Sequence, residues 1–224
     1  MTDPPPTPTE TAASTTARFG AAVARLIEHL PPSQLGPETA ADAPLRQSLR
    51  AALMKLTDAD LLLPGHRVVD LQAAACCRAG LWLGCDFLDE SHTISQSVET
   101  TSGSYWHGIM HRREPDPDNA KYWFRRVRQH PVFAPLAAAA ATAVNSSLAP
   151  PLGRDSRASA STVSSSGPAA YLATQAAWDP FRFVDLCERM RGTGGDGERL
   201  CRDIARIEWR LLFDYCYRQA LGLE

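Results

Sequence analysis

The stretch AAACCRAGLWLGCDFL, residues 73–88, decides the fold class. Apart from Arg78 and Asp86, its side chains are small or apolar on every side of a helix. A helix that lacks a polar face is stable only when other elements surround it, so we expect this stretch at the centre of the fold. It lies within a longer helical pattern, from Val68 to about Val98, which predicts one continuous helix.

Apolar residues at helical spacing continue on both sides of this stretch, and no run alternates between apolar and polar residues as a strand would. The further helices are expected at about residues 17–30, 42–56, 104–113, 117–129, 135–144, 180–191 and 198–221. The sequence therefore predicts an all-α fold, a single-domain bundle of about seven or eight helices with a central buried helix.

Two segments contain too few apolar residues to join a core. Residues 1–16 are rich in Pro and Thr, and residues 145–168 are rich in Ser, Ala, Pro and Gly. Such segments bury too little apolar surface to offset the entropy that is lost on ordering them. We therefore expect a disordered N-terminal tail at 1–16, and a helical domain at 17–224 that contains a disordered loop at 145–168.

The composition of the 224 residues argues against several classes of protein. A formal net charge of −2 disfavours a general nucleic-acid coat and a polybasic membrane anchor. No apolar run is long enough to predict a membrane-spanning helix. The six cysteines form no Cys-x-x-Cys pair, and most have apolar neighbours. Buried, reduced thiols in a cytoplasmic protein are therefore expected, rather than a zinc or disulfide framework.

Three carboxylates follow the apolar centre, and their spacing predicts one shared helix face. Asp86, Asp89 and Glu90 stand at positions i, i+3 and i+4. If buried, they need a metal, an arginine or a protonated histidine as a partner. His92 is a candidate ligand or orienting group beside them, so we expect Asp89, Glu90 and His92 to be catalytic. Alternatively, the helix enters solvent after Leu83 and the acids form an exposed end.

His107 and His111 are four residues apart, so a helix stacks their rings on one face. Two imidazoles one turn apart commonly chelate Zn²⁺ or Fe²⁺. Gly108 stands where the H-E-x-x-H motif has glutamate, so the metalloprotease motif is absent. With Asp86 or Glu90 the pair would complete a two-histidine, one-carboxylate metal site. The alternative is a metal-free pair of core histidines that is hydrogen-bonded to those acids.

The segment NAKYWFRRVRQH, residues 119–130, combines an aromatic core side with a basic stripe. Arg125 and Arg126, together with Trp106 and Arg112, are candidates for holding a small anionic or sugar-like molecule. Alternatively, Arg112, Arg113, Arg125 and Arg126 neutralise the acids of the central helix and Glu114. Nucleic-acid binding through this helix is the less favoured hypothesis, because the whole chain is not basic.

Three segments together resemble a family of uncharacterised bacterial all-helical proteins. They are FLDESHTISQ at 87–96, SYWHGIMHRRE at 104–114 and NAKYWFRR at 119–126. The resemblance covers about residues 68–135. It implies a shared helical fold, and it transfers no function because no activity is established for that family.

The sequence thus predicts a candidate histidine and carboxylate site between two helices. The favoured hypothesis is a metal-assisted or acid–base enzyme that acts on a small anionic or sugar-like molecule, with Zn or Fe as the possible cofactor. The alternative is a non-catalytic binding or scaffold module, in which the His, Asp and Arg residues form a structural network. Neither the substrate nor the oligomeric state follows from the residues.

Overall fold

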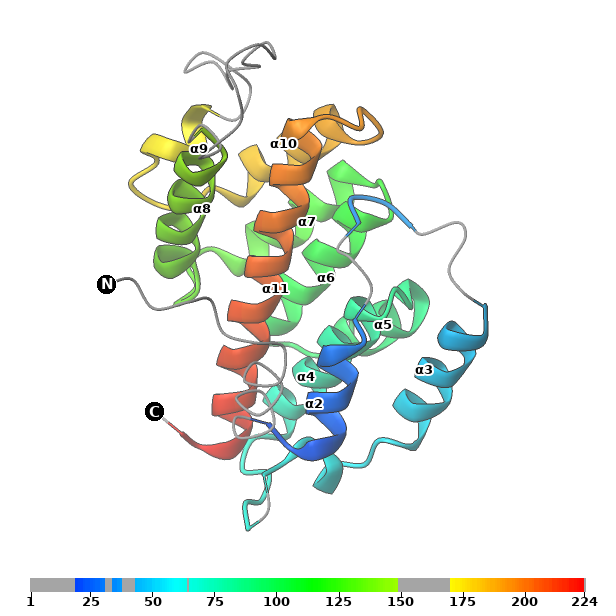
Figure 1. Cartoon of the computed structure of the whole chain (residues 1–224). Coiled ribbons are helices and arrows are strands. Elements are labelled where there is room, and N and C mark those ends of the chain that lie inside the picture. Colours follow the sequence, from blue (N-terminus) through cyan, green and yellow to red (C-terminus); the bar gives the residue numbers. More distant parts are fainter. Residues whose placement is uncertain (1–18, 31–33, 38–42, 64, 149–169, 224) are drawn as a thin grey trace, which may run out of the picture.

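The computed structural model describes residues 19–30, 34–37, 43–63, 65–148 and 170–223, and every regular element in these ranges is helical (Figure 1). The α-helices are α2 (Ala21–Glu28), α3 (Ala43–Lys55), α4 (Leu71–Gly84), α5 (Leu88–Ser95), α6 (Thr101–Arg113), α7 (Pro117–Val127), α8 (Phe133–Leu148), α9 (Ala170–Thr174), α10 (Pro180–Met190) and α11 (Asp196–Leu221). A short 3-10 turn, η1 (Ala59–Leu61), precedes α4. The all-α prediction is confirmed.

The number of helices differs from the expected seven or eight, since the described ranges contain ten α-helices. The pattern expected as one helix, 68–98, forms the separate helices α4 and α5, and the five-residue helix α9 was not predicted. Residues 145–148, expected in a loop, continue α8. The expected tail at 1–16 and the remainder of the expected loop, 149–168, lie outside the described residues.

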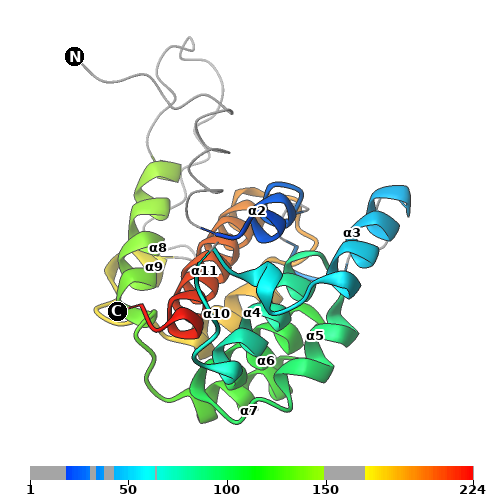
Figure 2. The same ribbon diagram turned by 90° about the horizontal axis from the view of Figure 1, so that it is seen from below.

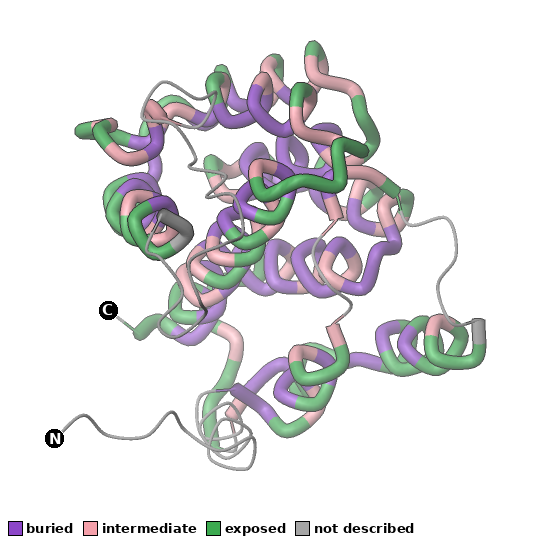
Figure 3. Tube along the Cα trace, turned by 45° about the horizontal axis from the view of Figure 1, so that its top comes forward, coloured by how far each residue is buried: buried purple, intermediate pink, exposed green. Residues whose placement is uncertain are grey.

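The long helix α11 runs the length of the molecule, with α8 and α9 on one side and α2, α4 and α6 on the other (Figures 1 and 2). The most completely buried helix is α6, in which all ten residues from 103 to 112 are buried (Figure 3). Helix α4, expected at the centre, packs against it. A Cβ at Gly80 of α4 would lie 2.8 Å from the Trp106 ring, so only glycine permits this close approach.

The break between α4 and α5 is a Schellman turn centred on Asp86. Asp86 has a left-handed φ of 64°, its N–H donates to the Leu83 carbonyl at 3.0 Å, and the Phe87 N–H donates to the Trp82 carbonyl at 2.9 Å. These two bonds satisfy carbonyls at the end of α4. The prediction of one continuous helix is therefore wrong, and Asp86 does not share a helix face with Asp89 and Glu90.

The helix expected from residue 104 begins earlier, at Thr101. The Thr100 side chain accepts a hydrogen bond from the Gly103 N–H at 3.0 Å, which caps the helix. The helix expected from residue 117 does begin there, with Pro117 as its first residue and Asp116 as a cap that accepts from the Asn119 N–H at 3.1 Å.

All six cysteines are buried and free, as the sequence predicts. They contribute to the core as small apolar residues, packed in the same cluster as the aromatic and aliphatic side chains. Across the described ranges, no helix has both the length and the apolar character that a bilayer crossing requires.

A buried ion pair joins the two most central helices. Arg112 of α6 is 2% exposed and donates to Glu208 of α11, which is 0% exposed. The Tyr105 hydroxyl donates to the other Glu208 carboxylate oxygen at 3.0 Å, and the Arg112 guanidinium lies over the Phe183 ring at 4.7 Å. Two opposite charges in a dry core stabilise each other only while both are present.

Removing either charge of this pair is expected to be strongly destabilising. Glu208→Gln or Arg112→Met should lower the free energy of unfolding by about 3–5 kcal/mol, because each leaves one buried charge unpaired. The double variant should lose less than the sum, since no uncompensated charge remains and Gln still accepts from Tyr105. Urea unfolding followed by tryptophan fluorescence measures this. Asp196→Asn, at the exposed ion pair with Arg199, is the control and should cost less than about 1 kcal/mol.

His130, between α7 and α8, is held in its neutral form by its hydrogen bonds. Its Nδ1 accepts from the Val132 N–H at 3.2 Å, so its Nε2–H is left to donate to the Ser102 hydroxyl at 3.1 Å. Its ring packs against Tyr105 and Tyr215. Burial lowers the pKa of His130 to about 4. Protonation of His130 would put a second proton on Nδ1, where it would face the Val132 N–H and break this hydrogen bond.

Because the pKa of His130 lies below that of an unfolded histidine, the unfolded chain takes up the proton first as the pH falls. The contribution of His130 to stability is therefore complete above about pH 6.5 and is lost toward pH 4, by up to about 3 kcal/mol. His130→Asn, which keeps an acceptor for Val132, should flatten the stability–pH curve in this window. Urea unfolding between pH 4 and 7 measures it. An unchanged slope would contradict the assignment, and exposed His66→Asn is the control.

Candidate metal centre

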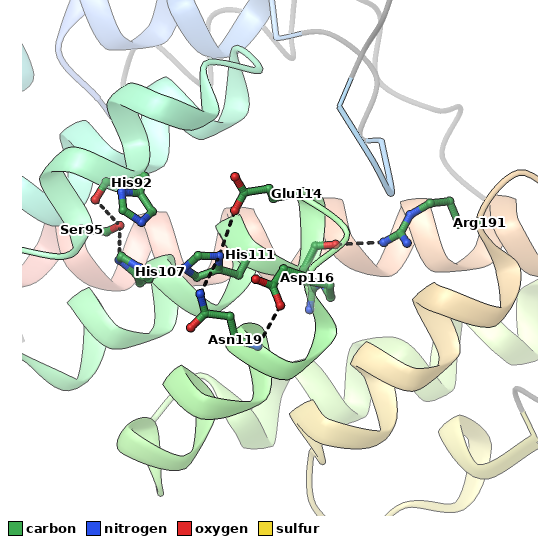
Figure 4. A network of polar contacts seen from close by, with 9 residues as sticks. His92, Ser95, His107, His111, Glu114, Asp116, Asn119 and Arg191 are labelled. Atoms are coloured by element: carbon green, nitrogen blue, oxygen red, sulfur yellow. Dashed lines mark hydrogen bonds and ion pairs between the residues drawn. The ribbon is translucent and has the colours of Figure 1, made fainter.

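Three histidines from two helices converge at one point (Figure 4). The centroids of the His107 and His111 rings on α6 are 4.8 Å apart, and the His92 ring on α5 lies 4.6 Å from that of His107 and 5.4 Å from that of His111. One nitrogen of each ring lies within 4.8 Å of the others. His107 and His111 are buried, whereas His92 is half-buried and forms the outer side of the cluster.

The local sequence explains why these side chains meet. His107 and His111 stack on one face of α6 because they are one helical turn apart. The connection from α5 to α6 spans only residues 96–100, so the two helices lie next to each other, and α5 carries His92 three residues before its end. The predicted pair is thereby extended to a triad by His92.

Hydrogen bonds engage Nδ1 of both buried rings. The Ser95 hydroxyl lies 3.0 Å from His107 Nδ1 and 3.3 Å from the His92 carbonyl, and it accepts from the ring when its own proton goes to that carbonyl. Glu114 can only accept, at 3.0 Å from His111 Nδ1, so His111 carries its proton there. In both rings Nδ1 is therefore used for a hydrogen bond, which leaves Nε2 as the nitrogen for a metal ion. Metal-binding histidines in proteins are oriented by this kind of second hydrogen bond.

The environment also keeps the two buried rings neutral. Burial lowers the pKa of His107 to about 3, and the nearby imidazoles of His111 and His92 add to this effect. Burial likewise lowers the pKa of His111, although the carboxylate of Glu114 acts in the opposite direction. Neutral imidazole is the form that coordinates metal ions, so no proton has to leave His107 or His111 at neutral pH.

Helix α7 covers the inner side of the cluster. The Trp123 ring lies 4.0 Å from the His107 ring at an angle of 38°, and the Asn119 amide lies 3.5 Å from His111 Nδ1. Both side chains occupy one face of α7, whose start is set by the Asp116 cap. Of the three histidines, His92 is the one that is half-buried, while Asn119 and Trp123 beside the other two rings are half-buried as well.

The structure does not bring the predicted carboxylate ligands into this cluster. Asp86 is buried and pairs with Arg113, and a second arginine, Arg46 of α3, lies 3.5 Å from its carboxylate. Glu90 pairs with Arg50 of α3, and Asp89 is exposed. Asp86 and Glu90 are thus neutralised by arginines of α6 and α3, and these partnerships depend on where the two helices pack.

The predicted ligand-holding residues lie in three different places. Trp106 is fully buried against Gly80, and Arg112 is paired with Glu208 in the core. Arg125 and Arg126 are exposed, and both line a groove of about 800 Å³ along the end of α7 and the start of α6. The Arg126 guanidinium also lies 5.1 Å from the Trp123 ring centroid.

Four residues around the histidines were not predicted as part of the site: Ser95, Glu114, Asn119 and Trp123. Two of them carried a usable signal, because Ser95 stands three residues after His92 and Glu114 three residues after His111, which is contact distance on a helix. Asn119 and Trp123 carried none, since their position depends on how α7 packs.

Comparison of the chain with protein-family models, with curated proteins and with solved structures finds no match. The inferences about this site therefore rest on its own geometry, and the resemblance to bacterial helical proteins stays a prediction.

The three histidines have the donor set of a tetrahedral metal site with one open position. Zinc takes imidazole nitrogens at about 2.0–2.1 Å, which places the ligand nitrogens ~3.3 Å apart. The nitrogens here lie within 4.8 Å of one another, so the rings must approach by no more than about 1.5 Å to reach that geometry. The half-buried His92 is the ring with room to move.

The tautomers of the two buried rings are directly measurable. Nitrogen-15 NMR of metal-free protein at pH 7 should show His107 and His111 protonated at Nδ1 and not at Nε2, because Ser95 and Glu114 accept those protons. His130 should show the opposite tautomer, which makes it an internal control. Nε2-protonated rings at both positions would contradict the assignment of the free lone pairs.

Proposed function

We propose that the protein binds a divalent transition metal, zinc or ferrous iron, through His92, His107 and His111, and that the bound metal assists chemistry on a small anionic molecule. The observation that carries this proposal is the convergence of three imidazoles, two of which have Nδ1 engaged by Ser95 and Glu114, so that Nε2 is the nitrogen left for a ligand. Many catalytic zinc sites have this set of ligands, with the other ring nitrogen held by a hydrogen bond.

The charge of the ligand set favours an anion in the open position. Three neutral imidazoles leave the full charge of the ion uncompensated, whereas a carboxylate ligand would reduce it. A divalent ion in such a site lowers the pKa of its bound water toward about 7 and polarises a bound oxyanion. Of the three ligands only His92 is partly open to solvent, so a substrate would reach the site from this side.

Arg126 adds a positive charge next to Trp123, which favours an anionic substrate near this helix. Its guanidinium and the His107 ring both contact this indole, and Arg126 lines the groove that it shares with Arg125 and Tyr122. Guanidinium groups bind carboxylate and phosphate in a two-pronged geometry. We also propose that the protein acts in the cytoplasm, because its six buried thiols are suited to a reducing compartment.

The second candidate function is a non-catalytic module in which the histidines hold a structural metal or none. The pairing of Asp86 and Glu90 with arginines favours it, because neither carboxylate is then free to act as a general base beside the histidines. The two candidates differ in whether a bound metal supports turnover.

Metal binding is tested on untagged protein by elemental analysis and by calorimetric titration with Zn²⁺. We expect about one metal per chain, and we expect His107→Ala or His111→Ala to weaken binding by at least about 100-fold, because only two ligands remain. His66→Ala, an exposed histidine outside the cluster, should bind as the parent does. Less than about 0.1 metal per chain together with no heat of binding would refute the proposal.

The same preparations separate the two candidate functions. Zinc-loaded and chelator-treated protein are compared for hydrolysis of small phosphate and carboxylate esters. The proposed enzyme should lose turnover on chelation and in His92→Ala, and Arg126→Gln should raise KM with kcat largely retained. Stoichiometric metal with no turnover on either ester class, and with raised thermal stability, would favour the structural module.

A further inference from the structure

A second site lies away from the histidines, in a cavity of about 270 Å³ bounded by α2, the end of α4, α6 and α11. The helices that form it are adjacent in Figures 1 and 2. Residues 34 and 35 cover one end, and the Leu35 carbonyl accepts from Arg191 Nε at 2.9 Å. Ile109 and Arg112 of α6 line this cavity, whereas His107 and His111 of the same helix belong to the candidate metal centre.

One wall of the cavity is apolar and firmly held. Leu30, Leu83 and Ile109 line it together with Trp209. The Trp209 indole is fixed because its Nε1 donates to the Gly80 carbonyl at 2.7 Å. This wall buries apolar ligand surface without having to rearrange.

A glycine lets the apolar wall pack closely on the end of α4. A Cβ at Gly84 would lie 2.9 Å from Leu30 and 3.1 Å from the ring of Trp209, which is tighter than most real Cβ contacts. The absence of a side chain at this position therefore allows Leu30 and Trp209 to sit directly against the helix backbone.

The same helices also bring arginines to the cavity lining. Arg206 and Arg210 are one turn apart on α11, both are exposed, and neither takes part in an ion pair with the described residues. Arg112 lines the cavity with a side chain that is 2% exposed, and its Nη1 has no hydrogen-bond partner in the described part of the chain. Glu28 is the one acid in the lining.

The unpaired arginines beside an apolar surface are the observation that points to a ligand. Arg206 and Arg210 bring two uncompensated charges to the same cavity as Trp209, so an anionic oxygen attached to an apolar body fits the lining best. Arg112 is a further donor, because Glu208 occupies its Nη2 and leaves Nη1 without a partner in the described part of the chain. That atom is itself buried, so a ligand oxygen reaches it only when the Arg112 side chain shifts, and the gain is then the removal of an unsatisfied buried N–H.

We propose that this cavity binds a small amphipathic carboxylate. Its carboxylate accepts from Arg112 and is neutralised by Arg206 and Arg210, and its short hydrocarbon body packs on Ile109 and Trp209. The cavity is slightly smaller than the ~300–1,000 Å³ of typical small-molecule sites, which favours a short chain over a long one. Binding at this site requires no metal, so its test is independent of the test of the proposed metal centre.

The probes for this proposal are octanoate, acetate and 1-octanol, titrated by calorimetry into the metal-free full chain. We expect octanoate to bind at about one per chain, and at least about tenfold more tightly than either other probe, since acetate lacks the apolar body and octanol lacks the charge. Octanol binding as tightly as octanoate would refute the role of the arginines in binding, and no octanoate binding up to about 10 mM would refute the site itself.

Variants locate the binding. Ala205→Phe places a ring into the cavity from α11 and should abolish octanoate binding, whereas Ala139→Phe, at a half-buried position of α8, is the matched control and should bind as the parent does. Arg206→Gln combined with Arg210→Gln should weaken octanoate by about tenfold and leave octanol within about twofold. Thermal unfolding verifies that each variant is folded. Octanoate binding that Ala205→Phe leaves unchanged would refute this location.

Discussion

The buried ion pair between Arg112 and Glu208 is the contact on which the arrangement of the centre depends. Neither charge tolerates a dry core alone, so α6 and α11 must pack with these two residues in register. The pair also sets the rotation of α6 about its own axis. With Arg112 directed to α11, the preceding residue, His111, faces Glu114 and α7, and the following residue, Arg113, reaches Asp86 at the break after α4.

The two sites follow from this arrangement of α6. Because the helix is surrounded, three of its polar side chains are each held by a specific partner: Ser95 holds His107, Glu114 holds His111, and Glu208 holds Arg112. For the two histidines, burial keeps the rings neutral and the hydrogen bonds at Nδ1 leave Nε2 for a ligand. For Arg112, the partner satisfies only part of the guanidinium, and the same side chain lines the second cavity.

Much of the fold was predictable, because helical periodicity, caps and prolines are local signals. The Asp116-Pro117 start of α7 and the helices α3 and α10 were located to within one or two residues. The break at Asp86 was not, since its left-handed turn is made by a non-glycine residue whose carboxylate is held by Arg113 and Arg46. Those arginines come from helices that are distant in sequence. The residues that stabilise the turn are therefore absent from the stretch of sequence around Asp86.

By itself, the sequence determined that the chain is all-helical, that residues 73–88 are buried, and that His107 and His111 share one face, because these properties depend on spacing along a helix. Only the tertiary structure decided which groups accompany that pair. Glu90 and Asp86, which were expected beside the pair, form ion pairs with Arg50 and Arg113. A third imidazole, that of His92, lies next to the pair in their place. The physical reason is that a charge selects its partner by distance in space, and that distance is set by helix packing rather than by chain order.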